Sequence, residues 1–110
     1  MSAPSITYTD LTYTITLFRE GKSVVSTFGE HSLSICAARE NELSAFERNK
    51  IKGPAAADGN LYYIYARHYD IALPNFVWLE SKEEAVALKD MLSELEAGQE
   101  DGEYSAFAAR

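Results

Sequence analysis

The stretch 11–28, LTYTITLFREGKSVVSTF, constrains the fold more than any other part of the chain. Tyr13, Ile15 and Leu17 alternate with threonines, and this period of two places the apolar side chains on one face of a strand. Tyr, Ile and Thr also suit a pleated, half-buried surface. A Glu-Gly pair at 20–21, where glycine can supply a positive φ angle, leads into a second alternating run. The pattern predicts a β-hairpin.

Three more segments have the composition of strands. Residues 31–37, HSLSICA, alternate after a Gly-Glu turn, and we expect them to be the third strand of the same meander. Residues 61–69, LYYIYARHY, resume the alternation, and residues 76–80, FVWLE, form a fifth short strand. We expect a bend over 70–75, because Pro74 cannot donate to a ladder and restricts the residue before it.

Two segments change to helical spacing. Over 39–50, apolar residues recur at helical intervals between charged ones, which predicts a short helix. A longer helix is predicted over 82–97, where apolar residues follow the i, i+3, i+4, i+7 pattern. Ser81 stands at the N-cap and Glu84 completes a capping box, while Gly98 suits the position just past the last turn.

Together these elements predict the α+β fold class. The order β-β-β-α-β-β-α indicates an antiparallel sheet of about five strands with the helices packed on one face. We expect residues 1–98 to form a single globular domain and residues 99–110 to be an acidic tail, either frayed or docked back through Tyr104 and Phe107. The N-terminus lacks the basic and apolar regions of a signal peptide, and one cysteine fits a reducing compartment, so the expected location is the cytoplasm.

The charge of the chain is concentrated near its C-terminus. Residues 80–103 hold nine carboxylates and two lysines, a sum of 9 − 2 = 7 negative charges, which equals the formal charge of the whole chain. Residues 1–79 are nearly neutral, with eight acids and seven bases. This balance argues against direct binding to nucleic acid or to a membrane surface, because both require clustered Lys and Arg. No apolar run approaches the ~20 residues of a membrane helix.

We recognise no sequence motif that is typical of a catalytic, metal-binding or phosphate-binding site in this chain. A thiol nucleophile at Cys36 needs a base such as His31 or His68, but His31 is five residues away along the same predicted strand. We therefore interpret Cys36 as a small, semi-buried side chain. There is no metal-ligand spacing such as HxxxH or CxxC and no glycine-rich phosphate loop, so we expect no cofactor, no metal and no enzymatic activity.

The acidic segment leads to a hypothesis of a binding protein. A carboxylate array on the outer side of the last helix speeds encounter with a basic protein surface, and tyrosines are favoured as interface anchors. The expected contact residues are seven carboxylates and three tyrosines: Glu83, Glu84, Asp90, Glu94, Glu96, Glu100, Asp101, Tyr62, Tyr63 and Tyr65. Small size, acidity and the lack of chemistry fit phage-type inhibitors of nucleic-acid-handling complexes, such as anti-CRISPR or anti-restriction proteins, in which carboxylates replace phosphates.

Three other interpretations stay open. The acidic face can serve solubility alone, and the tyrosines can belong to the core. A small-molecule-binding or enzymatic α+β domain would use a pocket near Tyr63, Tyr65, Arg67 and His68, between the sheet and the 39–50 helix. A homodimer, rather than a monomer, would pair exposed sheet edges.

Overall fold

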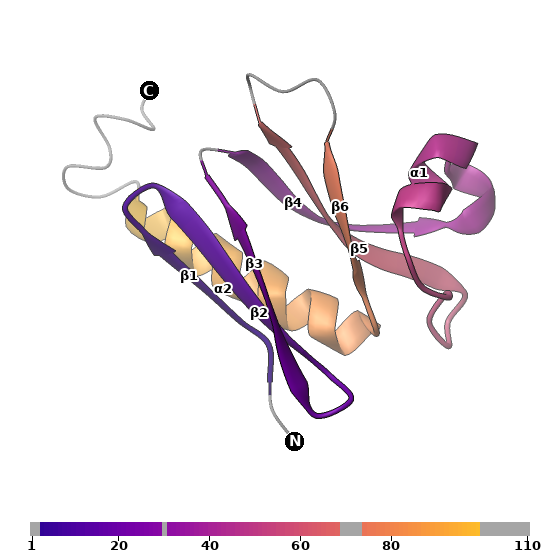
Figure 1. The fold of residues 1–110 in the computed structure, drawn as a ribbon, viewed down its shortest axis with the longest axis horizontal. Helices are drawn as coiled ribbons and strands as arrows, with labels where there is room; N and C mark the ends of the chain where they lie inside the picture. Colours follow the sequence, from indigo (N-terminus) through magenta and orange to yellow (C-terminus); the bar gives the residue numbers. More distant parts are fainter. Residues whose placement is uncertain (1–2, 30, 69–73, 100–110) are drawn as a thin grey trace.

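The computed structural model describes the backbone of residues 3–29, 31–68 and 74–99 (Figure 1). These residues form two three-stranded antiparallel sheets, a long C-terminal helix and a short covering segment. The elements in chain order are β1 (Ser5–Thr9), β2 (Thr12–Arg19), β3 (Lys22–Phe28), β4 (His31–Arg39), the 3-10 helix η1 (Glu40–Glu42), α1 (Ala45–Lys50), β5 (Asn60–His68), β6 (Asn75–Leu79) and α2 (Lys82–Gln99). The α+β class predicted from the sequence is therefore confirmed.

The first sheet consists of two hairpins in the order β1-β2-β3. Each hairpin closes through a two-residue turn in which both residues have positive φ angles: Asp10 (52°) with Leu11 (61°), and Glu20 (55°) with Gly21 (80°). Such turns match the right-handed twist of the strands they join. The β2–β3 hairpin was predicted from the alternating pattern, whereas β1 was not predicted, because the turn that precedes β2 lacks the usual glycine.

The second sheet has the order β4-β5-β6, so the prediction of one sheet of about five strands is wrong. β4 does not continue the meander. The chain leaves the first sheet after Phe28, and β4 pairs with β5, from His31 opposite His68 to Arg39 opposite Asn60. The two sheets differ in how many of their faces are apolar. One face of the first sheet carries partly exposed threonines, whereas β4 and β5 carry apolar side chains on both faces. A sheet that is apolar on both faces needs a cover on each side.

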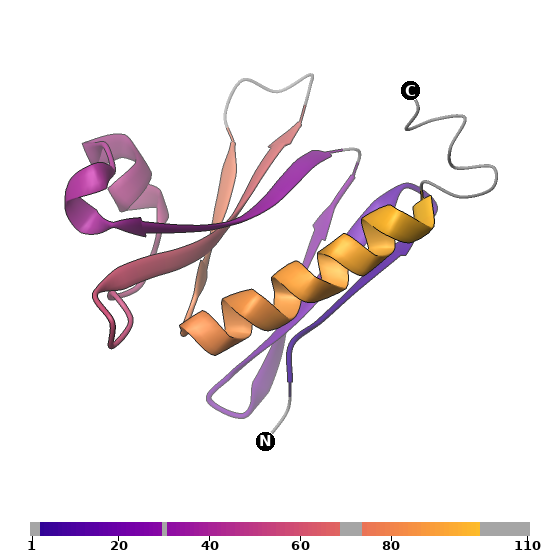
Figure 2. The same ribbon diagram turned by 180° about the vertical axis from the view of Figure 1, so that it is seen from behind.

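One cover is α2, which lies across both sheets (Figures 1 and 2). Its buried stripe of Ala85, Leu88 and Leu92 joins a core that includes Ile15 of β2 and Ile64 of β5, and Leu88, Ile15 and Ile64 are 0% exposed. This packing is what unites the two sheets. In the described residues, no helix is both long enough and apolar enough to cross a membrane.

The other cover is the segment of η1, α1 and the loop after them. Ile51 packs with Leu61 and Tyr63 in a second, smaller cluster on the face of β5 that does not meet α2. The helices therefore lie on opposite faces of the second sheet, and not on one face as predicted. The predicted 39–50 helix is interrupted at Ser44, which caps α1 by accepting a hydrogen bond from the Glu47 N–H.

The last helix agrees closely with its prediction at the start and differs at the end. The Ser81 hydroxyl accepts the N–H of Glu84 at 3.1 Å, as expected for an N-cap. The Glu84 carboxylate, however, accepts the backbone N–H of Glu80 at 2.8 Å instead of completing the capping box on Ser81. Gly98 lies inside the helix, which continues to Gln99. The expected bend over 70–75 and the predicted tail 99–110 fall largely outside the described residues, and Gln99 is the last residue of α2 and not part of a tail.

Candidate binding surface

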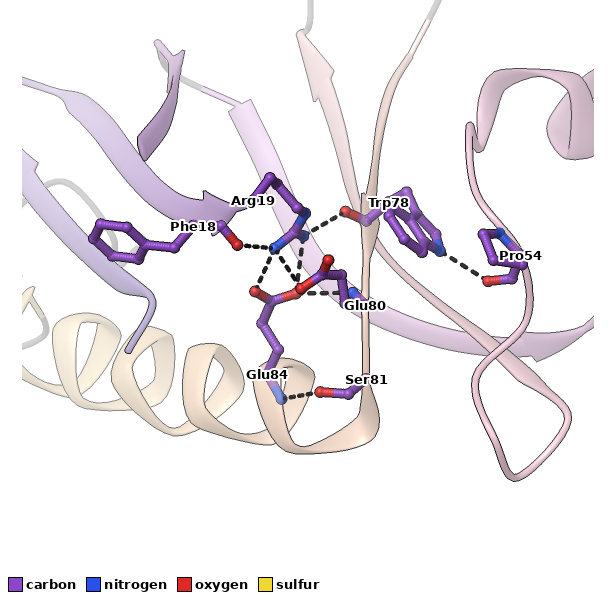
Figure 3. Close-up of polar contacts among 7 residues, drawn as sticks. All are labelled: Phe18, Arg19, Pro54, Trp78, Glu80, Ser81 and Glu84. Atoms are coloured by element: carbon purple, nitrogen blue, oxygen red, sulfur yellow. Dashed lines mark hydrogen bonds and ion pairs between the residues drawn. The ribbon is translucent and has the colours of Figure 1, made fainter. Parts of the chain in front are cut away.

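A charged junction at the start of α2 fixes the geometry of the surface next to it (Figure 3). Arg19, the last residue of β2, binds Glu84 in a two-pronged pair with N–O distances of 2.7 and 2.9 Å. The same guanidinium donates to the carbonyls of Phe18 and Trp78 and lies 3.3 Å from Glu80. The Arg19 and Glu84 side chains are only 18% and 11% exposed. This junction ties the first sheet to the second sheet and to α2.

An open hollow of about 750 Å³ lies beside the junction. The segment before β1, the β2–β3 turn and the first turns of α2 form its walls, and its carboxylates are Glu20, Glu80, Glu83 and Glu84. Arg19 binds Glu84 and also pairs with Glu80, so its single positive charge offsets one of the four carboxylates; Glu20 and Glu83 form no ion pair within 4.0 Å among the described residues. A hollow lined by several exposed carboxylates attracts cationic side chains.

The negative charge continues along one flank of α2. Asp90 and Glu94 follow Glu83 at intervals of seven and eleven residues, which places all three on the same side of a helix. All three are exposed. Together with Glu20 and Glu80 they form what we call the acidic surface: Glu20, Glu80, Glu83, Asp90 and Glu94.

The flank of α2 that faces β4 has a different character. Lys82, Val86 and Lys89 lie at intervals of four and seven residues, and all are exposed. They line a hollow of about 180 Å³ against β4, together with Ile35 and other apolar residues of that strand. The two lysines thus lie on the side of α2 that faces β4, whereas Glu83, Asp90 and Glu94 lie about 100° around the helix from them. Glu83 and Lys82 meet at a further hollow, which Asp58 and Glu80 also line.

The predicted carboxylates consequently divide into groups. Glu83, Asp90 and Glu94 lie together, whereas Glu96 is seven residues from Lys89 and shares the lysine flank. The expectation that Glu84 lies on the outer side is wrong, because its side chain is turned inward to Arg19. Residues 100 and 101, the predicted contacts Glu100 and Asp101, lie outside the described residues.

The predicted tyrosine anchors do not form an exposed surface. Tyr62 is 7% exposed within the main core, and its hydroxyl donates a hydrogen bond to Asp58. Tyr63 is 8% exposed in the second cluster, where Tyr65 also packs in part. The alternation of β5 put the tyrosines on both of its faces, and each face has its own cover. Tyr62 and Tyr63 serve packing, so they are corrected from contact residues to core residues.

Packing also fills the place where the alternative ligand pocket was expected. Leu61 and Tyr63 meet Ile51 and Leu43 between β5 and the covering segment. Arg67 is exposed near the C-terminal end of β5, and the side chain of His68 is not among the parts of the chain that the structure describes. The geometry of the described residues therefore gives no support to a pocket lined by Tyr63.

Cys36 has the properties of a packing residue. It is half-buried against the second cluster. Burial raises the pKa of its thiol, although a hydrogen bond with Tyr63 and the charge of Lys89 act in the opposite direction. A thiol with a raised pKa stays protonated at neutral pH and is a poor nucleophile. Among the described residues, no three His, Cys, Asp or Glu side chains are grouped as metal ligands.

The residues that sequence reasoning missed are Glu20 and Glu80. Glu80 belongs to the acidic segment, but Glu20 is sixty residues away in the β2–β3 turn, and the two line the same hollow beside the contact of Arg19 with Glu84. No local sequence pattern predicts that these two residues lie together. Comparison with known proteins found no matching family model, no matching curated protein and no matching solved structure, so the function is inferred from this geometry alone.

Proposed function

We propose that this chain is a small, non-catalytic binding protein whose acidic surface engages a basic surface on a protein partner. The observation that supports the proposal is the gathering of five exposed carboxylates around and beyond one open hollow. Arg19 pairs with Glu84 and with Glu80, so the other four members of the acidic surface are the ones that form no ion pair within 4.0 Å in the described residues: Glu20, Glu83, Asp90 and Glu94. Charge arranged in this way accelerates encounter with basic partners and rejects acidic ones.

We propose further that the partner is a nucleic-acid-handling complex and that this chain blocks it as a phage-type inhibitor. Along the axis of α2, Glu83 and Asp90 are about 10.5 Å apart and Asp90 and Glu94 about 6 Å apart. A cationic groove that tracks a nucleic-acid backbone could accept this row of carboxylates in its place.

A pair of charge-matched variants tests the electrostatic part of the proposal. Glu83→Gln with Glu94→Gln removes two carboxylates of the acidic surface. Asp10→Asn with Glu96→Gln removes two exposed carboxylates outside the acidic surface and is the control. Each protein is immobilised and exposed to a bacterial lysate over a salt series, and captured proteins are quantified by mass spectrometry. We expect the first pair to lose basic partners that the control retains, most clearly at low salt. Equal capture by both pairs contradicts the proposal.

Competition with DNA tests the partner class. Proteins captured by the unmodified chain are challenged with an excess of duplex DNA at constant ionic strength. If the acidic surface occupies a nucleic-acid groove, the DNA releases the partner, because both ligands require the same cations. A partner that stays bound under this challenge refutes the groove, even where the charge variants have shown that the acidic surface binds.

A further inference from the structure

We propose that the lysine flank of α2 and the free edge of β4 form a second binding surface, which takes an extended acidic segment of a protein partner by strand addition. This surface lies on the other flank of α2 from the acidic surface and prefers the opposite charge. The proposal does not depend on the proposed function, because it involves different residues, a different ligand and a separate assay.

The first observation is the unprotected edge of β4. In the described part of the chain, β4 hydrogen-bonds to β5 on one side and to no strand on the other. It spans nine residues, His31–Arg39, and residues 32–38 contain neither a charge nor a proline. Natural sheets usually blunt such an edge with charges, proline or short length. An exposed edge of this kind offers unpaired N–H and C=O groups to an added strand.

The second observation is the hollow of about 180 Å³ beside this edge. Three consecutive residues of β4, Ile35 to Ala37, line it together with Val86 of α2. Val86 is 47% exposed, and Ala37 is exposed as well. A strand added to β4 would direct alternate side chains toward α2, so one apolar side chain of the strand fits between Ala37 and Val86.

The third observation is the charge around the hollow. Lys82 and Lys89 lie at its two ends, about 10.5 Å apart along the helix. Among the described residues, neither forms an ion pair within 4.0 Å. The nearest carboxylates lie beyond the ends of the hollow: Asp58, Glu80 and Glu83 border Lys82 on its other side, and Glu96 follows Lys89 by two helical turns. In a chain with a net charge of −7, two adjacent lysines with an apolar residue between them favour an occupant of complementary charge.

These observations select an extended segment that alternates apolar and acidic residues. A second copy of this chain fits less well, because pairing β4 with itself about a two-fold axis would bring the lysine flanks of both copies together. Each copy also carries the same net negative charge. A basic segment is excluded by Lys82 and Lys89.

A displayed library of random seven-residue peptides provides the probe. We expect selection on the full chain to enrich peptides that alternate Val or Ile with Asp or Glu. The best peptide is then synthesised with a fluorescent label and titrated by polarisation. Lys82→Gln with Lys89→Gln should weaken its binding about fivefold, since each exposed charge pair contributes modestly. The control, Lys22→Gln with Lys52→Gln, changes two exposed lysines elsewhere and should leave binding unchanged.

N-methylation of the peptide, one amide at a time, distinguishes strand addition from a simple charge contact. Only alternate amides of an added strand donate to the edge, so the loss of affinity should alternate along the peptide. Enrichment of basic peptides, failure to enrich any acidic peptide, or equal loss at every amide overturns the proposal. Sedimentation of the free protein completes the test: a dimer that dissociates on Ala37→Lys would show that the occupant is a second copy, and would also overturn it.

Discussion

The ion pair between Arg19 and Glu84 is expected to contribute strongly to stability, and Glu84→Gln tests this. The pair has two hydrogen bonds of 2.7 and 2.9 Å, and its side chains are 18% and 11% exposed. Breaking a fully buried pair costs about 3–5 kcal/mol, whereas an exposed pair contributes about 0–1 kcal/mol. The partial exposure, and the second carboxylate of Glu80 at 3.3 Å, place the expected loss near 2 kcal/mol.

The free energy of unfolding is measured by urea titration with Trp78 fluorescence as the probe, in a double-mutant cycle with Arg19→Met. A loss of about 2 kcal/mol corresponds to a fall in Tm of roughly 8 °C for a domain of this size. We expect a coupling energy of at least 1 kcal/mol between the two residues. The matched control is Glu83→Gln, one residue away and exposed, which should change stability by less than about 0.5 kcal/mol. Coupling below 0.5 kcal/mol would refute the view that the junction holds the sheets together.

Three further predictions concern single contacts. Gly53→Ala should lower stability by about 1–3 kcal/mol and shift tryptophan fluorescence, because the added Cβ would lie 2.1 Å from the Trp78 ring; unchanged spectra would contradict this. Leu11→Gly should raise the unfolding free energy by about 1 kcal/mol in thermal melts, because it relieves a φ of 61°, and a loss of stability would show that the side chain matters more. Tyr62→Phe should destabilise the protein at pH 5 and above but progressively less below pH ~4. The hydrogen bonds from Tyr62 and Asn60 lower the pKa of the Asp58 carboxyl in the folded protein. Their contribution to stability is therefore present above the unfolded pKa of ~3.9 and is lost as the pH falls through the folded pKa. Urea midpoints from pH 2 to 6 measure it, and a difference independent of pH would contradict it.

The elements that were predictable from the sequence are those with local causes. The β2–β3 hairpin follows from alternation around Glu20-Gly21, and the start of α2 follows from Ser81 as a cap. The β1–β2 hairpin was missed because its turn is Asp10-Leu11, and a non-glycine residue such as Leu11 rarely adopts a positive φ. Local patterns thus identify strands and caps only where the chain uses the usual residues.

Pairing partners have non-local causes, and this is where the prediction failed. Alternation identifies β4 as a strand but does not state that Ile35 lies opposite Ile64 of β5 and not beside β3. The tyrosines of β5 illustrate the same limit. Their period of two assigns them to two faces, but only the packing of α2 on one face and of Ile51 on the other makes both faces interior.

The candidate site lies between these two cases. Once Leu88 is known to be buried, helical phase separates Glu83 and Asp90 from Lys82 and Lys89, so the two flanks of α2 can be predicted from the sequence. The inward orientation of Glu84 cannot be predicted in this way, because it depends on a contact with Arg19, which is 65 residues earlier in the chain.

This sorting of charge changes what net charge implies about the molecule. A value of −7 suggests a uniformly acidic body that repels every anion, yet Lys82 and Lys89 stand on the same helix as Glu83 and Asp90. Lys82 and Glu83, like Lys89 and Asp90, are consecutive residues about 100° apart around the helix, so their charges lie within roughly one Debye length (~8 Å) and are only partly screened from each other. A partner that contacts both the acidic surface and the lysine flank would therefore have to present basic and acidic groups side by side. Such a pair of groups would fix the orientation in which α2 is bound.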